Sequence, residues 1–133
     1  MKILIAEDEQ VSARLLQEIM ITWGAVDMAR DGQTAIDLWL HAIKNGVLYD
    51  LICLDIMMPE KTGHQALEQI RELERDYGVG GKEMVPVIMT TVLADKENVL
   101  QAFLKGICQA YVVKPITFEK MRDELLRLEL ITP

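Results

Sequence analysis

The sequence predicts an α/β fold, a doubly wound parallel sheet of five strands with helices on both faces. Two observations carry this prediction. Short apolar runs of strand length alternate along the chain with segments whose apolar residues repeat at helical spacing. The runs are almost continuously apolar, as expected of parallel strands that are buried on both faces. Right-handed crossovers leave few topologies for such a chain.

The first two strand-helix units occupy the N-terminal third of the chain. Residues 2–6 form an apolar run that stops at acidic residues, and a helical pattern begins at Val11 and ends near Gly24. Residues 25–29 read as the second strand. Asp31 is placed to cap the next helix, which runs until Gly46.

The remaining units follow the same alternation. Residues 50–55 predict the third strand, 63–77 the third helix and 78–82 a plain loop. Residues 85–91 predict the fourth strand, and Asp95 caps a helix that stops before Gly106. Residues 110–113 predict the fifth strand, after which Thr117 starts the last helix. At 133 residues the chain has the size of one domain, so we expect residues 1–133 to form a single domain.

Composition limits the classes of function. The net charge of −7, from 14 basic and 21 acidic residues, has the wrong sign for a protein that follows a phosphate backbone, so we expect no direct nucleic-acid binding. The longest uncharged stretch, residues 84–94, is too short to cross a membrane, and no signal peptide opens the chain. Cys53 and Cys108 lie among apolar residues and fit free thiols in a reducing compartment. These features predict a cytoplasmic protein without membrane contact.

Polar side chains end four of the five predicted strands. They are Glu7 and Asp8 after the first, Asp55 at the third, Thr90 and Thr91 at the fourth, and Lys114 after the fifth. Ligand sites of open parallel sheets lie beyond these carboxyl ends. Taken singly, Asp8 also fits a helix cap, Asp55 a turn residue, and Lys114 a solvated strand end. Thr91 alone would be an ordinary strand residue. Only the topology predicts that they converge.

Together these groups suit phosphoryl transfer. Clustered carboxylates repel one another unless a cation neutralises them, and hard oxygen ligands favour Mg²⁺. Beside such an ion Asp55 can act as a nucleophile on a phosphoryl group and form an acyl phosphate. Lys114 and the Thr91 hydroxyl would then hold the phosphate oxygens.

Four motifs give the chain a family resemblance over essentially its full length. They are ILIAEDE at the first strand, LICLDIMMPEKTG at the third, VPVIMTT at the fourth and YVVKP at the fifth. With these motifs the chain resembles the receiver domain of bacterial two-component response regulators, of the kind found in chemotaxis regulators.

The resemblance implies a role for each site residue. It implies that Asp55 accepts the phosphoryl group, that Lys114 contacts the phosphate and that the Lys114–Pro115 bond is cis. The implied magnesium ligands are Glu7, Asp8, Asp55 and the backbone carbonyl of Met57. Thr91 and Tyr111 are implied to reorient together as the switch.

The resemblance also implies the flavodoxin-like (βα)5 fold with strand order 2-1-3-4-5, and it implies the function. The expected protein is a phosphorylation-dependent signalling switch that accepts a phosphoryl group from a histidine kinase or a histidine phosphotransfer protein. It would be no enzyme beyond catalysing its own phosphorylation and dephosphorylation. Its downstream partner would read the face made by the fourth helix, fifth strand and fifth helix.

Departures from the family pattern add one expectation. Val92 stands where the family usually has Ala or Gly, and Ile107-Cys108 replaces a frequent Ala-Asp. Met57 and Leu93 should flank the path of a water that attacks phosphorylated Asp55, and neither side chain can orient that water. We therefore expect slow self-dephosphorylation.

Two other classes of protein place similar chemistry on similar folds. A dehalogenase-like phosphatase also has a nucleophilic aspartate after a parallel strand, but usually needs a second acid where this chain has Met57. A flavodoxin-like electron carrier needs a phosphate loop after its first strand, where residues 7–9 are acidic and would repel the flavin phosphate. Outside the site, the charged run at residues 71–76 predicts a solvated helix face, and His41 and His64 predict no function.

Overall fold

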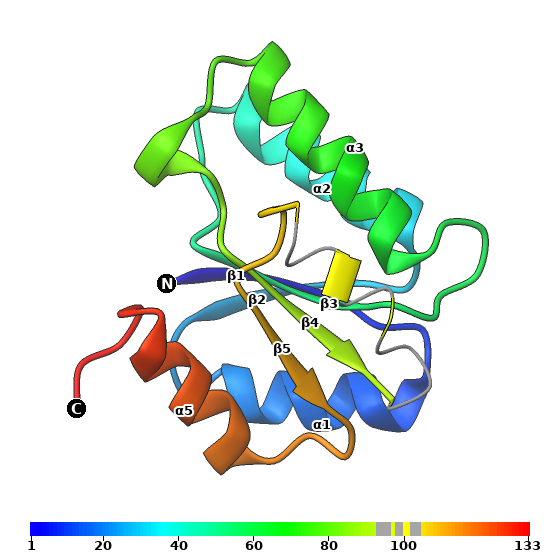
Figure 1. Cartoon of the computed structure of the whole chain (residues 1–133), viewed down its shortest axis with the longest axis vertical. Coiled ribbons are helices and arrows are strands. Elements are labelled where there is room, and N and C mark those ends of the chain that lie inside the picture. The colour runs from blue at the N-terminus through cyan, green and yellow to red at the C-terminus, as the bar shows by residue number, and fades with distance from the viewer. Residues whose placement is uncertain (93–96, 98–99, 102–104) are drawn as a thin grey trace.

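The computed structural model describes residues 1–92, 97, 100–101 and 105–133. Its centre is a sheet of five parallel strands in the predicted order, β2-β1-β3-β4-β5 (Figure 1). The strands are β1 (Lys2–Ala6), β2 (Ala25–Ala29), β3 (Leu51–Asp55), β4 (Val87–Thr91) and β5 (Ala110–Val113). The α-helices with described bounds are α1 (Gln10–Met20), α2 (Gly32–Lys44), α3 (Gly63–Asp76) and α5 (Phe118–Arg127).

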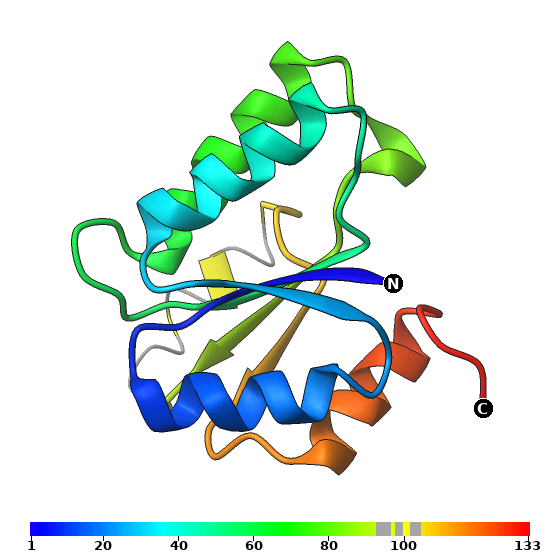
Figure 2. The ribbon, with the colours of Figure 1, turned by 180° about the vertical axis from the view of Figure 1, so that it is seen from behind.

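The helices form two layers around the sheet. In both views α2 and α3 lie on one side of it and α1 and α5 on the other (Figures 1 and 2). Because successive strand residues point to opposite faces, each strand contributes to two cores. Leu4, Ile52 and Met89 pack on the side of α2 and α3. Ile5, Cys53 and Ile88 pack on the side of α1 and α5.

Most sequence-based boundaries agree with the structure. The first, second and fifth strands have the expected bounds, and Asp31 and Thr117 cap α2 and α5 by accepting the backbone amides of Thr34 and Lys120. The prediction of a plain loop over residues 78–82 was wrong at its last two residues, which belong to a short 3₁₀ helix, η1 (Gly81–Glu83). Asp95, the expected cap of the fourth helix, and Leu93 lie outside the described residues. Cys53 and Cys108 are buried free thiols, as expected.

The cap of α1 differs from the sequence-based alternative. Glu9, and not Asp8, caps this helix, because its carboxylate accepts the backbone amides of Val11 at 3.0 Å and Ser12 at 2.7 Å. These hydrogen bonds hold the pKa of Glu9 below its usual value. Asp8 is left exposed next to the carboxyl edge of the sheet.

The prediction of a solvated face for residues 71–76 was wrong at two of the six positions. Arg71 and Glu74 are 2% and 1% exposed, and they form an ion pair of 2.7 Å between Nη1 and Oε1. The Arg71 guanidinium also donates to the Ile107 carbonyl at 3.0 Å and to Gln109 Oε1 at 3.2 Å. Glu74 Oε2 accepts the backbone amide of Val85 at 2.8 Å. We call these five groups, three side chains and two backbone groups, the Arg71 network. It joins the end of α3 to the starts of β4 and β5.

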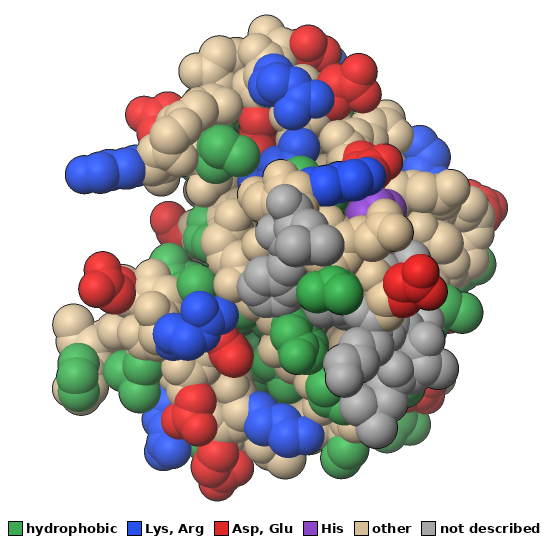
Figure 3. All heavy atoms as spheres, in the orientation of Figure 1, with side chains coloured by type: hydrophobic (Ala, Val, Ile, Leu, Met, Phe, Trp, Pro, Cys, Tyr) green, Lys and Arg blue, Asp and Glu red, His purple; other side chains and the backbone are tan. Residues whose placement is uncertain are grey.

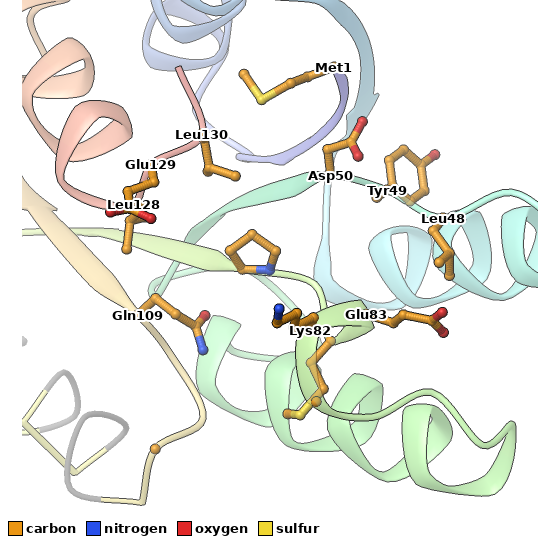
Figure 4. Close-up of a pocket in the computed structure, with 14 residues that line it drawn as sticks. Met1, Leu48, Tyr49, Asp50, Lys82, Glu83, Gln109, Leu128, Glu129 and Leu130 are labelled. Atoms are coloured by element: carbon orange, nitrogen blue, oxygen red, sulfur yellow. The ribbon is translucent and has the colours of Figure 1, made fainter. Parts of the chain in front are cut away.

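The amino edge of the sheet also carries a pocket of about 860 Å³. Lys82 and Glu83 of η1 lie on one side of it and Leu128, Glu129 and Leu130 on another (Figure 4). This pocket lies at the opposite edge of the sheet from Asp55, so it is separate from the polar residues at the carboxyl ends of the strands.

The described surface in Figure 3 has no large region of a single charge. Over the described part of the face in Figure 3, acidic and basic side chains are interspersed. Among the described residues, no helix is long and apolar enough to cross a membrane.

Candidate functional site

The carboxyl ends of the central strands bring the predicted acids and lysine together. Glu7 follows β1, Asp55 ends β3 and Lys114 follows β5. The register pairs Ala6 with Leu54 and Asp55 with Thr90, so Glu7 and Asp55 lie beside each other at the same edge. Glu7 is 3% and Asp55 is 4% exposed. The apolar strand β3 thus ends in an acid because Asp55 belongs to an ionic cluster at this edge of the sheet.

Lys114 bridges the two buried carboxylates. Its Nζ lies 2.6 Å from Glu7 Oε1 and 3.3 Å from Asp55 Oδ2. The other carboxylate oxygen of Asp55 accepts the backbone amide of Met57 at 3.3 Å, as a turn residue would. The alternative of Lys114 as a solvated strand end is therefore wrong, because its ammonium group is turned inward onto two acids.

Burial and charge set the protonation of the cluster. Burial, and then the hydrogen bond and negative charge of Glu7, raise the pKa of Asp55 to about 7, although Lys114 opposes this shift. Burial by itself lowers the pKa of Lys114, but the hydrogen bond to Glu7 and the charges of Asp55 and Glu7 raise it overall. The cluster therefore holds excess negative charge at a cost that a further cation would relieve.

The donor set fits a hard divalent cation. Glu7, Asp8 and Asp55 each offer a carboxylate oxygen, and these atoms lie within 4.8 Å of one another. Asp8 is exposed, so the cluster is open to solvent on that side. Carboxylate oxygens with room for water are the ligands that Mg²⁺ prefers. The residues present thus fit the magnesium site expected from the sequence.

The chain behind Asp55 is held by a close backbone contact. Gly63, the first residue of α3, lies where a Cβ atom would come within 2.1 Å of the Asp55 carbonyl oxygen. Its amide donates to the Ile56 carbonyl at 2.8 Å. Only glycine allows this approach. It fixes the path of the chain just after the acid, and with it the position of the Asp55 carboxylate.

Of the two predicted switch residues, Thr91 has a hydroxyl bonded to a backbone carbonyl, and Tyr111 lies at the surface on β5. The Thr91 hydroxyl donates to the backbone carbonyl of Val92 at 2.8 Å, and Tyr111 on β5 is 40% exposed. The Lys114–Pro115 peptide bond is cis, as the resemblance implied. Thr91 therefore ends β4 one residue after Thr90, the register partner of Asp55, with its hydroxyl on the Val92 carbonyl.

Sequence reasoning assigned no role to two residues at this edge. Glu9, besides capping α1, donates its backbone amide to Glu7 Oε2 at 3.2 Å and so orients that acid. Thr90 is 1% exposed, and its register partner is Asp55. In the sequence, only its position at the end of the fourth strand indicated a role for Thr90. The motif VPVIMTT assigned the hydroxyl role to the adjacent Thr91 instead.

Comparisons with known proteins agree with this geometry. The profile of the response regulator receiver domain matches residues 3–126. The chain is 35% identical over 131 residues to the transcriptional regulatory protein ResD of Bacillus subtilis, covering 98% of this chain and 47% of ResD. It is 34% identical over 130 residues to the hybrid signal transduction histidine kinase I of Dictyostelium discoideum, covering 97% of this chain and 7% of the kinase. The chain thus spans less than half of either relative.

A solved structure shows the same fold. The receiver domain of the Saccharomyces cerevisiae response regulator Ssk1, in a co-crystal with the histidine phosphotransfer protein Ypd1, superposes with a TM-score of 0.77. The two sequences are 24% identical, and the match covers 93% of this chain and 85% of that one. With the matching profile, strand order and acid cluster, the chain belongs to the response regulator receiver domain family of two-component signalling.

Proposed function

We propose that this protein is a signalling switch that accepts a phosphoryl group on Asp55 and thereby changes its partner-binding surface. One observation carries the proposal. Asp55 ends a buried strand between a carboxylate and an ammonium group, and Lys114 lies 3.3 Å from one of its oxygens. A purely structural acid would be paired one to one, whereas this cluster has more acids than bases.

In this proposal each side chain has a distinct task. Bound Mg²⁺, held by Glu7, Asp8, Asp55 and the Met57 carbonyl, would neutralise the acids and the incoming phosphoryl oxygens. Asp55 supplies the nucleophilic oxygen. Lys114 is already within reach of Asp55 and would hold a phosphoryl oxygen as a charge-assisted donor.

The proposed partners follow from the same role. The phosphoryl donor would be a histidine kinase or a histidine phosphotransfer protein, and we propose that residues 1–133 act as one receiver domain. The output surface would be the face made by the expected fourth helix, whose bounds lie outside the described residues, with β5 and α5. On this face Tyr111 and Phe118 are 40% and 37% exposed. Phosphorylation adds roughly −1.5 to −2 charge beside Lys114. Turning Thr91 toward that charge would free space for Tyr111 to reorient.

Labelling the protein tests the acceptor. Incubation with Mg²⁺ and acetyl phosphate should add one phosphoryl group, which mass spectrometry should locate on Asp55. Asp55→Asn should accept none, while Asp50→Asn, an acid at the amino edge, should be labelled like the wild type. Stable labelling of Asp55→Asn at the wild-type level would show that another residue is the acceptor.

A phosphate mimic tests the output surface. Adding beryllofluoride with Mg²⁺ should shift the backbone amide resonances of β5 and α5 more than those of α2. Shifts confined to α2 would contradict the proposed face.

A further inference from the structure

Thr90 carries a buried hydroxyl that has no hydrogen-bond partner. Among the described residues, the side-chain atoms that are buried without a partner are Thr90 Oγ1 and His64 Nδ1. A buried hydroxyl without a partner has given up its hydrogen bonds to water and gained none in return, which is unfavourable. An aliphatic side chain would fill the same place in β4 without this cost, so the hydroxyl needs an explanation.

Strand geometry places this hydroxyl beside Asp55. Thr90 and Asp55 are partners in the register of β3 and β4, and the Ile56 amide donates to the Thr90 carbonyl at 3.2 Å. Paired residues on adjacent parallel strands point to the same face, about 4.7–4.9 Å apart. The side chains of Thr90 and Asp55 therefore stand side by side.

The alternation of side chains confirms which face they share. Ile88, two residues before Thr90, and Cys53, two before Asp55, both pack in the core under α1 and α5. Thr91 belongs to the opposite face, and its hydroxyl already donates to the Val92 carbonyl at 2.8 Å. Thr90 is thus the hydroxyl of β4 on the Asp55 side of the sheet.

Lys114 lies over the same position. It follows β5, yet its ammonium group reaches Asp55 on β3 and Glu7 after β1, and β4 is the strand between β5 and β3. Its side chain must therefore cross the end of β4 on the face of Thr90. While Lys114 holds Asp55 Oδ2, that oxygen already has a strong donor.

We propose that Thr90 is a second hydrogen-bond donor for Asp55, used when Lys114 turns from the Asp55 carboxylate to the phosphoryl group. This inference rests on the proposed function. In the phosphorylated protein one Asp55 oxygen is bonded to phosphorus, and the other loses its ammonium partner. The neighbouring Thr90 hydroxyl then donates to the oxygen that Lys114 has left.

The donor changes the rate at which the phosphoryl group is lost. In hydrolysis a water oxygen bonds to phosphorus, the bond from phosphorus to the Asp55 oxygen breaks, and its electron pair returns to Asp55. The protons of the water pass to the phosphate product and to solvent. Negative charge therefore grows on the Asp55 carboxylate, and a hydroxyl donor stabilises this charge more than it stabilises the acyl phosphate.

The test compares Thr90→Val, which has the same shape without the hydroxyl, with Thr90→Ser, which keeps it. The wild type and both variants should be labelled on Asp55 by acetyl phosphate. After the donor is removed, Thr90→Val should lose its phosphoryl group about 3–30-fold more slowly than the wild type, and Thr90→Ser should decay close to the wild-type rate. Thr90→Ala is a second variant without the hydroxyl and should decay as slowly as Thr90→Val.

The outcomes separate this inference from the proposed function. Equal decay of wild type and Thr90→Val, or slow decay of Thr90→Ser, would overturn the role of the hydroxyl while leaving Asp55 as the acceptor. Absence of label on wild-type Asp55 would overturn both. Thermal unfolding of the unphosphorylated proteins is the control. Thr90→Val should be at least as stable as the wild type, because it removes an unpaired buried group.

Discussion

Two clusters of buried charge lie at opposite edges of the sheet and differ in how their charges are balanced. In the Arg71 network one guanidinium faces one carboxylate, and backbone and amide groups complete their hydrogen bonds. At the carboxyl edge three acids lie together, Lys114 pairs with two of them, and the pKa of Asp55 is raised to about 7. A balanced, satisfied cluster holds elements together. An unbalanced one stores a cost that a ligand or a reaction can relieve.

The largest expected effect comes from unbalancing the Arg71 network. Arg71→Met leaves Glu74 as a buried, unpaired charge, so the free energy of unfolding should fall by about 3–5 kcal/mol. Urea denaturation measures this. The control is Arg75→Met on the exposed side of the same helix, which should change stability by at most about 0.5 kcal/mol. Equal effects of the two variants would mean that the network does not hold α3 to the sheet.

The second prediction concerns water at the carboxyl edge. Solvent reaches this edge at Asp8 and Met57, whereas Arg71 and Glu74 are buried. Met57 is 60% exposed and cannot orient a water. Met57→Asn with Leu93→Glu should shorten the lifetime of phosphorylated Asp55, by up to about 10²-fold. Decay of the phosphorylated protein in magnesium buffer measures it, with Met57→Leu as the apolar control. A wild-type half-life of seconds would already contradict the expected slow decay.

The third prediction is a variant that raises the free energy of unfolding, whereas Arg71→Met lowers it. Asp55→Asn removes an acid whose charge is disfavoured, so without divalent cations it should stabilise the protein at pH 8 by about 1–3 kcal/mol. The folded protein holds this proton more tightly than the unfolded chain. Wild-type stability due to Asp55 is therefore fully present below about pH 4 and is lost as pH rises to about 7. The advantage of the variant should vanish toward pH 4.

Urea denaturation in EDTA at several pH values tests this reversal. Asp8→Asn is the matched control and should have the smaller effect, because Asp8 is exposed. If Asp55→Asn destabilises the protein at pH 8, the carboxyl-edge cluster is a structural one like the Arg71 network.

The smallest expected effect is on metal binding. Lys114 competes with a divalent cation for the oxygens of Glu7 and Asp55, so Lys114→Met should bind Mg²⁺ more tightly, by about tenfold. Isothermal titration calorimetry measures the affinity. Lys120→Met is the control, because Lys120 donates to the Val113 and Pro115 carbonyls instead. Weaker binding by Lys114→Met would show that Lys114 orders the acids more than it competes for them.

Local pattern determined much of the fold before any tertiary contact was known. Apolar runs marked the strands, and Asp31 and Thr117 marked helix starts, because strand alternation and capping act over a few residues. The convergence of Glu7, Asp55 and Lys114 also followed, since parallel strands end at one edge of their sheet.

Tertiary structure decided which charges are buried and what they contact. Arg71 and Glu74 have the spacing of an exposed helical ion pair, and only the approach of Ile107 and Gln109, more than 30 residues away, closes them from solvent. Sequence alone allowed Asp8 as the cap of α1, but in the folded chain the Glu9 carboxylate accepts the first amides of this helix. The unpaired Thr90 hydroxyl became visible only through its register with Asp55. Burial of a polar group depends on distant elements, and a local pattern contains no record of them.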